Sequence, residues 1–203
     1  MGNVTEAQLN NLDRVLGESY KKWSTDAVTA KTKVLLSFGS REDGIYYAFN
    51  LRKGIMEKAG ITDKYEVYVD AQSNIEHPST LFEDRHGVTI PLNPLWEQLY
   101  ENAVKHCKCM VFICTEEWAK SQYCLKEYSW WLQHAAKTPI VTMVFTDAIG
   151  KLGASPILAS GASKLTGRNR MIQVHKSSKP VVPDNCQPEL DELMGYLREF
   201  GAV

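Results

Sequence analysis

The sequence predicts an α/β fold, an open parallel sheet of five strands with helices on both faces, preceded by an N-terminal helix. Short, nearly continuous apolar runs alternate along the chain with segments whose apolar residues recur at helical spacing. This alternation is typical of a parallel sheet, because a helix that covers one face connects each pair of parallel strands. The composition agrees: 203 residues, of which 44% are hydrophobic and 23% charged, can build a substantial core.

Five apolar runs are expected to form the sheet, and they are spaced widely enough for a helix or a long loop between them. In chain order they are Lys33–Phe38, Tyr65–Val69, Cys109–Cys114, Pro139–Phe145 and Met171–Val174. The last run is the shortest. An open parallel sheet of five strands that carries helices on both faces has the flavodoxin-like arrangement.

Amphipathic patterns predict the helices that cover the sheet. They lie at Ile45–Lys58, Leu95–His106 and Ser121–Lys137, and a C-terminal helix has Pro188 in its first turn and Gly201 at its end. Two long segments show neither helical nor strand periodicity. We expect these segments, Asp70–Pro94 and Thr146–Arg170, to be irregular loops, which in compact domains are usually functional or mobile.

Residues 1–30 are expected to form a separate amphipathic helix. Thr5 and Gln8 fit a capping box, and an apolar stripe follows at near-heptad spacing. The stripe consists of Leu9, Leu12, Leu16, Tyr20 and Trp23. The helix either folds back on its own domain or forms a seam with a partner. We therefore divide the chain into a helical extension, 1–30, and one domain, 31–203.

Charge and cysteine content argue against several classes of protein. The formal net charge of -1 does not favour nucleic acid as a partner. The longest apolar runs are far shorter than the roughly 20 residues that span a bilayer, and no secretory signal is visible, so we expect a cytoplasmic protein without a membrane partner. The five cysteines fit neither a zinc site nor a disulfide framework, and we expect reduced thiols and no metal.

Ligands of open α/β sheets bind beyond the carboxyl ends of the strands, where the strand order reverses. The loop after the first strand, Phe38–Gly44, is polar and flanked by two glycines. Its backbone N–H groups and Arg41 could hold a phosphate near a helix N-terminus. It matches neither a G-x-G-x-x-G motif nor a Walker A loop.

The helix after the third strand carries a carboxylate among aromatic residues. Ser121 is the expected N-cap, which places Glu127 in the second helical turn. Helical spacing is expected to put Glu127 on one face with Tyr123, Cys124, Trp130 and Trp131. Burying a carboxylate among aromatic residues destabilises the folded state unless the carboxylate has a hydrogen-bonding or charged partner. It is therefore either a structural pair or a group poised beside a ligand.

The run Ser121-x-Tyr123-Cys124-Leu125-x-Glu127 resembles the Ser-x-Trp-Cys-x-x-Glu stretch of many Toll/interleukin-1 receptor (TIR) domains, with tyrosine in place of the commoner tryptophan. The resemblance extends in order from the first strand through Phe145. It implies membership of the branch that cleaves NAD⁺ at the nicotinamide–ribose bond, with Glu127 as the catalytic residue. The implied substrate-binding residues are Phe38, Gly39, Ser40, Arg41, Asp43, Trp118, Ser121 and Tyr123, where Trp118 or Tyr123 would offer a ring face to a base.

One carboxylate suits this chemistry. Nicotinamide leaves as a neutral ring, so its departure needs no general acid, and positive charge develops on the ribose. A fixed carboxylate can stabilise that charge. NAD⁺ is then the substrate and no cofactor is needed. The expected products are nicotinamide and either ADP-ribose or an isomer of cyclic ADP-ribose, with a role in defence or cell-death signalling.

Two other functions remain open at this stage. The first is a non-catalytic interaction module that self-associates through the 70–94 loop, which corresponds to the family's BB loop, and through the N-terminal helix. The second is an enzyme like the nucleoside deoxyribosyltransferases, which share the α/β architecture and N-glycosidic chemistry.

Overall fold

The computed structural model describes part of the chain in enough detail to discuss. The described residues are 30–39, 43–63, 65–69, 80–83, 89–92, 96–135, 138–145, 169–174 and 187–203. The expected helix within residues 1–30 and most of the two expected loops lie outside these ranges. So do Ser40 and Arg41.

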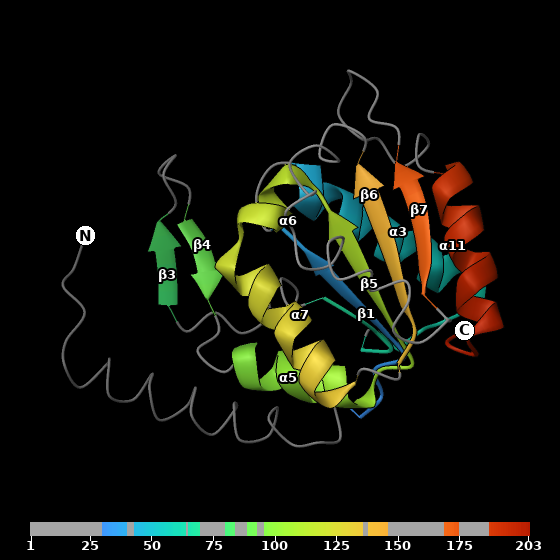
Figure 1. Ribbon diagram of the computed structural model, residues 1–203, viewed down its shortest axis with the longest axis horizontal. Coiled ribbons are helices and arrows are strands. Elements are labelled where there is room, and N and C mark those ends of the chain that lie inside the picture. Colours follow the sequence, from blue (N-terminus) through green and yellow to red (C-terminus); the bar gives the residue numbers. More distant parts are fainter. Residues whose placement is uncertain are drawn as a thin grey trace.

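The described strands include a five-stranded sheet in which all paired neighbours are parallel (Figure 1). Its order is β2-β1-β5-β6-β7. The strands are β1 (Val34–Phe38), β2 (Val67–Tyr68), β5 (Cys109–Cys114), β6 (Ile140–Phe145) and β7 (Arg170–Val174). This order is that of the flavodoxin-like fold, which confirms the predicted fold class.

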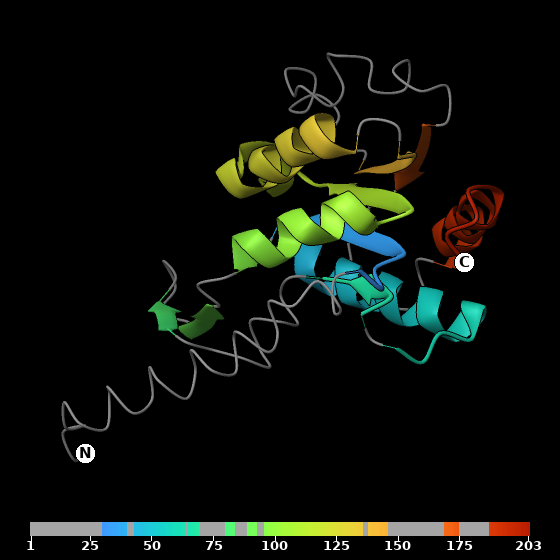
Figure 2. The same ribbon diagram turned by 90° about the horizontal axis from the view of Figure 1, so that it is seen from below.

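Helices cover both faces of the sheet (Figure 2). They are α3 (Asp43–Ala59), α5 (Trp96–His106), α6 (Glu116–Lys120), α7 (Gln122–His134) and α11 (Gln187–Glu199). On one face α3 packs against α11, and on the other α5 packs against α7. The short helix α6 was not expected, and α7 ends three residues earlier than predicted, at His134.

One predicted strand is shorter than expected, and one predicted loop was wrong. The expected strand Tyr65–Val69 forms a ladder only over β2, because Glu66 belongs to a turn closed by its N–H bond to the Asp63 carbonyl. The expected irregular loop Asp70–Pro94 contains two antiparallel strands, β3 (Thr80–Glu83) and β4 (Thr89–Leu92). They form a sheet of their own, apart from the parallel sheet (Figure 1).

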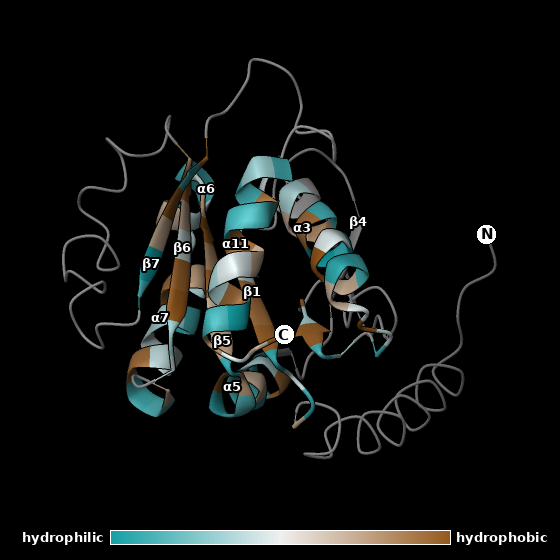
Figure 3. Ribbon diagram, turned by 90° about the vertical axis from the view of Figure 1, so that its right-hand side faces the viewer, coloured by the Kyte–Doolittle hydropathy of each residue, from teal (hydrophilic) through white to brown (hydrophobic). Residues whose placement is uncertain are grey.

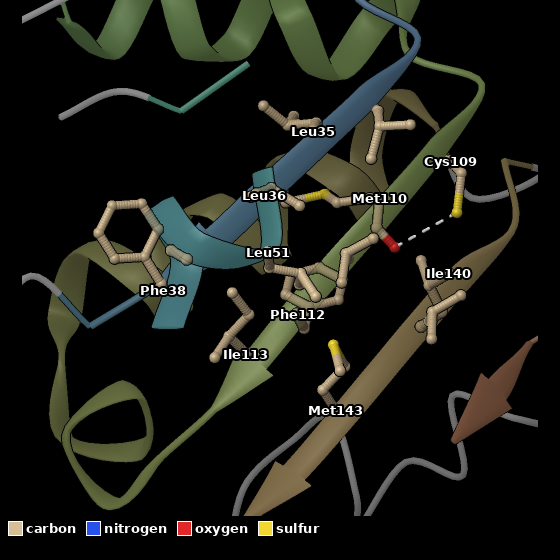
Figure 4. Close-up of a cluster of buried hydrophobic side chains, with 14 of the residues drawn as sticks. Leu35, Leu36, Phe38, Leu51, Cys109, Met110, Phe112, Ile113, Ile140 and Met143 are labelled. Carbon is tan, nitrogen blue, oxygen red and sulfur yellow. Dashed lines mark hydrogen bonds between the residues drawn. The ribbon is translucent and has the colours of Figure 1, made fainter. Parts of the chain in front are cut away.

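The core lies between the sheet and its helices. All residues of β1, β5 and β6 are buried, and their side chains fill the space on both faces (Figure 4). The helices turn hydrophilic residues outward (Figure 3). Two polar side chains interrupt these apolar strands, Ser37 in β1 and Thr142 in β6. Because a buried hydroxyl must find a partner, the contacts of Ser37 bear directly on the site.

Candidate functional site at the end of the central strands

The strand order reverses between β1 and β5. The two strands are parallel neighbours, with Phe38 opposite Ile113. From β1 the chain continues through α3 to β2, and from β5 it continues through α6 and α7 to β6 on the other side. In open α/β sheets a ligand binds beyond the carboxyl ends of two such strands.

Two capped helices, α6 and α7, lead away from the end of β5. The Thr115 hydroxyl accepts a hydrogen bond from the Trp118 N–H at 3.2 Å and caps α6. The Ser121 hydroxyl accepts from the Cys124 N–H at 3.3 Å and caps α7, which confirms the predicted N-cap. The caps fix where each helix starts and hence which side chains face β1.

Glu127 faces β1 and is only 4% exposed. Its Oε2 accepts a hydrogen bond of 2.5 Å from the Ser37 hydroxyl, and that hydroxyl accepts one of 2.8 Å from the Trp118 indole N–H. One turn earlier on α7, the Cys124 thiol donates to the Phe38 carbonyl at 3.4 Å. Cys124 and Glu127 of the motif therefore form hydrogen bonds with two consecutive residues at the end of β1.

This geometry explains why the motif needs its spacing. Residues three apart on a helix lie on one face, so Cys124 and Glu127 can both reach one strand. The 2.5 Å distance from Ser37 lies in the range of hydroxyl bonds to an ionised carboxylate. The arrangement holds a carboxyl group, negatively charged when ionised, beside the place where the strand order reverses. Such a charge can stabilise a cationic group brought to that place.

The structure brings several predicted site residues together and separates others. Phe38 and Gly39 directly follow Ser37, the residue that is hydrogen-bonded to Glu127. Phe38 accepts the hydrogen bond from Cys124, and Asp43 begins α3. Trp118 is fully buried against Phe112, with ring centroids 5.6 Å apart, so neither ring face is exposed.

Tyr123, by contrast, is 62% exposed and does not share the buried face of α7 as expected. The residue that faces β1 in the first turn is Cys124, one position and about 100° further around the helix. Of the two rings named as base-stacking candidates, only Tyr123 is exposed.

Ser37 is a residue of the candidate site that sequence reasoning missed. A signal was available, because it is the single polar residue in the strand sequence VLLSF. A hydroxyl in the middle of an otherwise apolar buried strand requires a polar partner from a covering element.

Two glycines, Gly39 after β1 and Gly44 in the first turn of α3, lie close together. A Cβ on Gly44 would lie 2.5 Å from the Gly39 carbonyl oxygen, closer than any real contact. We therefore expect Gly44→Ala to lower the free energy of unfolding by about 1–3 kcal/mol, because backbone must move to admit the methyl group. The measurement is urea denaturation of the purified variant.

Gly195→Ala is the matched control for this substitution. Gly195 lies in α11, is exposed, and has no atom within 4 Å of the added Cβ. Alanine there is expected to raise the free energy of unfolding by about 0.4–1 kcal/mol, because it restricts the unfolded chain. If Gly44→Ala were as stable as the wild type, the close approach of Gly44 to the Gly39 carbonyl would be refuted.

The described residues contain no metal-binding cluster, disulfide or membrane-spanning helix. In the part of the chain that the structure describes, no cluster of three or more His, Cys, Asp or Glu could hold a metal ion. The described cysteines are unbridged thiols, and burial raises the pKa of Cys107 to about 12. No helix among the described residues has the length and apolar character to cross a membrane.

Fold and site together define an open α/β protein with an anchored carboxylate at the reversal of strand order. In sequence the chain is similar to the 3' cyclic ADP-D-ribose synthase HopAM1 of Pseudomonas syringae pv. tomato (strain ATCC BAA-871 / DC3000), with 31% identity over 127 residues. The similar region is 59% of this chain and 45% of the relative, so the chain matches less than half of that protein's length. No family model and no solved structure matches.

Proposed function

We propose that this chain is a TIR-type enzyme that cleaves NAD⁺ at the nicotinamide–ribose bond. The observation that carries the proposal is Glu127, a carboxylate 4% exposed and hydrogen-bonded to β1 where the strand order reverses. The similarity to a 3' cyclic ADP-D-ribose synthase supports it independently, because ADP-ribose is what remains of NAD⁺ after nicotinamide leaves.

In the proposed reaction the bond between the nicotinamide nitrogen and the ribose carbon breaks. Its electron pair returns to the nicotinamide ring, which leaves neutral, and positive charge develops on the ribose as in glycoside hydrolysis. Glu127 stabilises this charge as a fixed anion, and its hydrogen bond from Ser37 keeps it in place. Water as the acceptor gives ADP-ribose and a proton. An acceptor within the same molecule gives a cyclic product, which the similarity to a cyclase favours.

The proposal also covers nucleotide binding, self-association and the cellular role of the protein. The exposed ring of Tyr123 stacks on a base, and the loop from Phe38 to Asp43 holds the nucleotide. The 70–94 segment and residues 1–30 mediate self-association. The protein acts in the cytoplasm without nucleic acid or membrane, in defence or cell-death signalling, and NAD⁺ is its substrate rather than a cofactor.

The test is to incubate the purified chain with NAD⁺ and follow free nicotinamide, with light scattering on the same samples. We expect nicotinamide to accumulate in proportion to enzyme. Assembly without turnover at any concentration would replace this proposal with a scaffold. A parallel reaction with deoxynucleosides and a free base tests the deoxyribosyltransferase alternative, for which we expect no base exchange.

A further inference from the structure

Three buried groups from three elements form one hydrogen-bonded chain at the site. Trp118 of α6 donates to Ser37 of β1, and Ser37 donates to Glu127 of α7. An indole N–H can only donate, so the Ser37 oxygen must act as its acceptor. The single hydroxyl proton is then available for Glu127 alone. The indole fixes the direction of the first hydrogen bond, and with an ionised Glu127 the second runs from Ser37 to the carboxylate.

We infer that Ser37 is a positioning residue that aims the Glu127 carboxylate for catalysis, with its own hydroxyl oriented by Trp118. The inference rests on the proposed function and deepens it. The hydrogen bonds of Ser37 place it between α6 and α7, the two helices that lead away from the end of β5.

The mechanical reason lies in the position of Ser37. β1 pairs with β5 along its whole length, with Ser37 opposite Phe112, and its first two residues also pair with β2, so its backbone is held in the sheet. Glu127, in contrast, reaches the site through a flexible side chain from a helix. A carboxylate that loses a buried hydrogen-bond donor is either displaced or driven towards its neutral form. A neutral or misdirected Glu127 stabilises a developing cation poorly.

The test compares three substitutions of Ser37 by steady-state kinetics on NAD⁺. Ser37→Ala removes the hydroxyl, Ser37→Cys keeps the approximate size with a weak donor, and Ser37→Thr keeps the hydroxyl. We expect kcat to fall about 10- to 100-fold in the Ala and Cys variants, as for other residues that orient a catalytic group. KM should stay near the wild-type value, and Ser37→Thr should recover most of kcat.

Thr142→Val is the matched control, because it removes another buried hydroxyl from the same sheet, in β6, which β5 separates from β1. It should leave kcat unchanged, and circular dichroism should show that all four variants are folded. Ser37→Cys with wild-type kcat, or Thr142→Val as impaired as Ser37→Ala, would overturn the inference while the proposed function stands. A wild-type protein that does not cleave NAD⁺ would instead overturn the proposed function, and the inference with it.

Discussion

Glu127→Gln is expected to lower kcat for NAD⁺ cleavage at least about 100-fold, the loss typical of one preorganised electrostatic group. The amide has nearly the shape of the carboxylate, and its oxygen can still accept the hydrogen bond from Ser37. The substitution therefore removes the negative charge with little change in packing. The measurement is the rate of nicotinamide release at saturating NAD⁺, with KM determined in parallel.

Glu97→Gln provides the matched control. Glu97 lies on α5 and pairs at the surface with Lys126, the residue before Glu127, at 2.6 Å. This substitution also removes one negative charge close to α7, but exposed pairs contribute little. We expect kcat and stability near the wild-type values. Equal activity of Glu127→Gln and the wild type would exclude a catalytic role for this carboxylate.

Trp118→Ala is expected to lower the free energy of unfolding by about 3–5 kcal/mol, the usual cost of removing a large buried aromatic side chain. Trp118 is fully buried and packs edge-on against Phe112 of β5. It also donates the hydrogen bond that orients Ser37. Urea denaturation should show a lower midpoint concentration of urea. The m-value should be similar to that of the wild type, because the lost contacts belong to the folded state.

Trp118→Phe separates packing from hydrogen bonding in this prediction. Phenylalanine keeps most of the apolar contact with Phe112 but has no donor for Ser37. We expect a loss of stability well below that of Trp118→Ala, because much of the buried apolar surface remains. A loss in Trp118→Ala of less than about 1 kcal/mol would contradict the burial described for this residue.

The sequence predicted the sheet well where burial is complete. The central strand β5 has the predicted bounds, Cys109–Cys114, because an apolar run buried on both faces leaves a continuous signal. The hairpin β3–β4 was not predicted. Its second strand contains Pro91, opposite Leu81, and proline argues against a strand unless it lies in an edge. In a two-stranded sheet both strands are edges, so β4 tolerates its proline.

The candidate site was predicted in part. Glu127 and the Ser121 cap follow from helical spacing and from the motif, and the structure places both as expected on α7. Ser37 lies 90 residues away in sequence from Glu127, so its contact depends on how α7 lies across β1. Helix spacing alone could not decide whether Tyr123 or Cys124 faces the strand, since the two differ by one position.

The identity of the products formed from NAD⁺ tests the central claim most directly. The purified chain is incubated with NAD⁺, and the products are separated by chromatography and identified by mass spectrometry. We predict nicotinamide in equal amount to the sum of ADP-ribose and any cyclic ADP-ribose, which is lighter than ADP-ribose by one water. Recovery of NAD⁺ intact, from protein whose folding and assembly have been verified, would contradict the account.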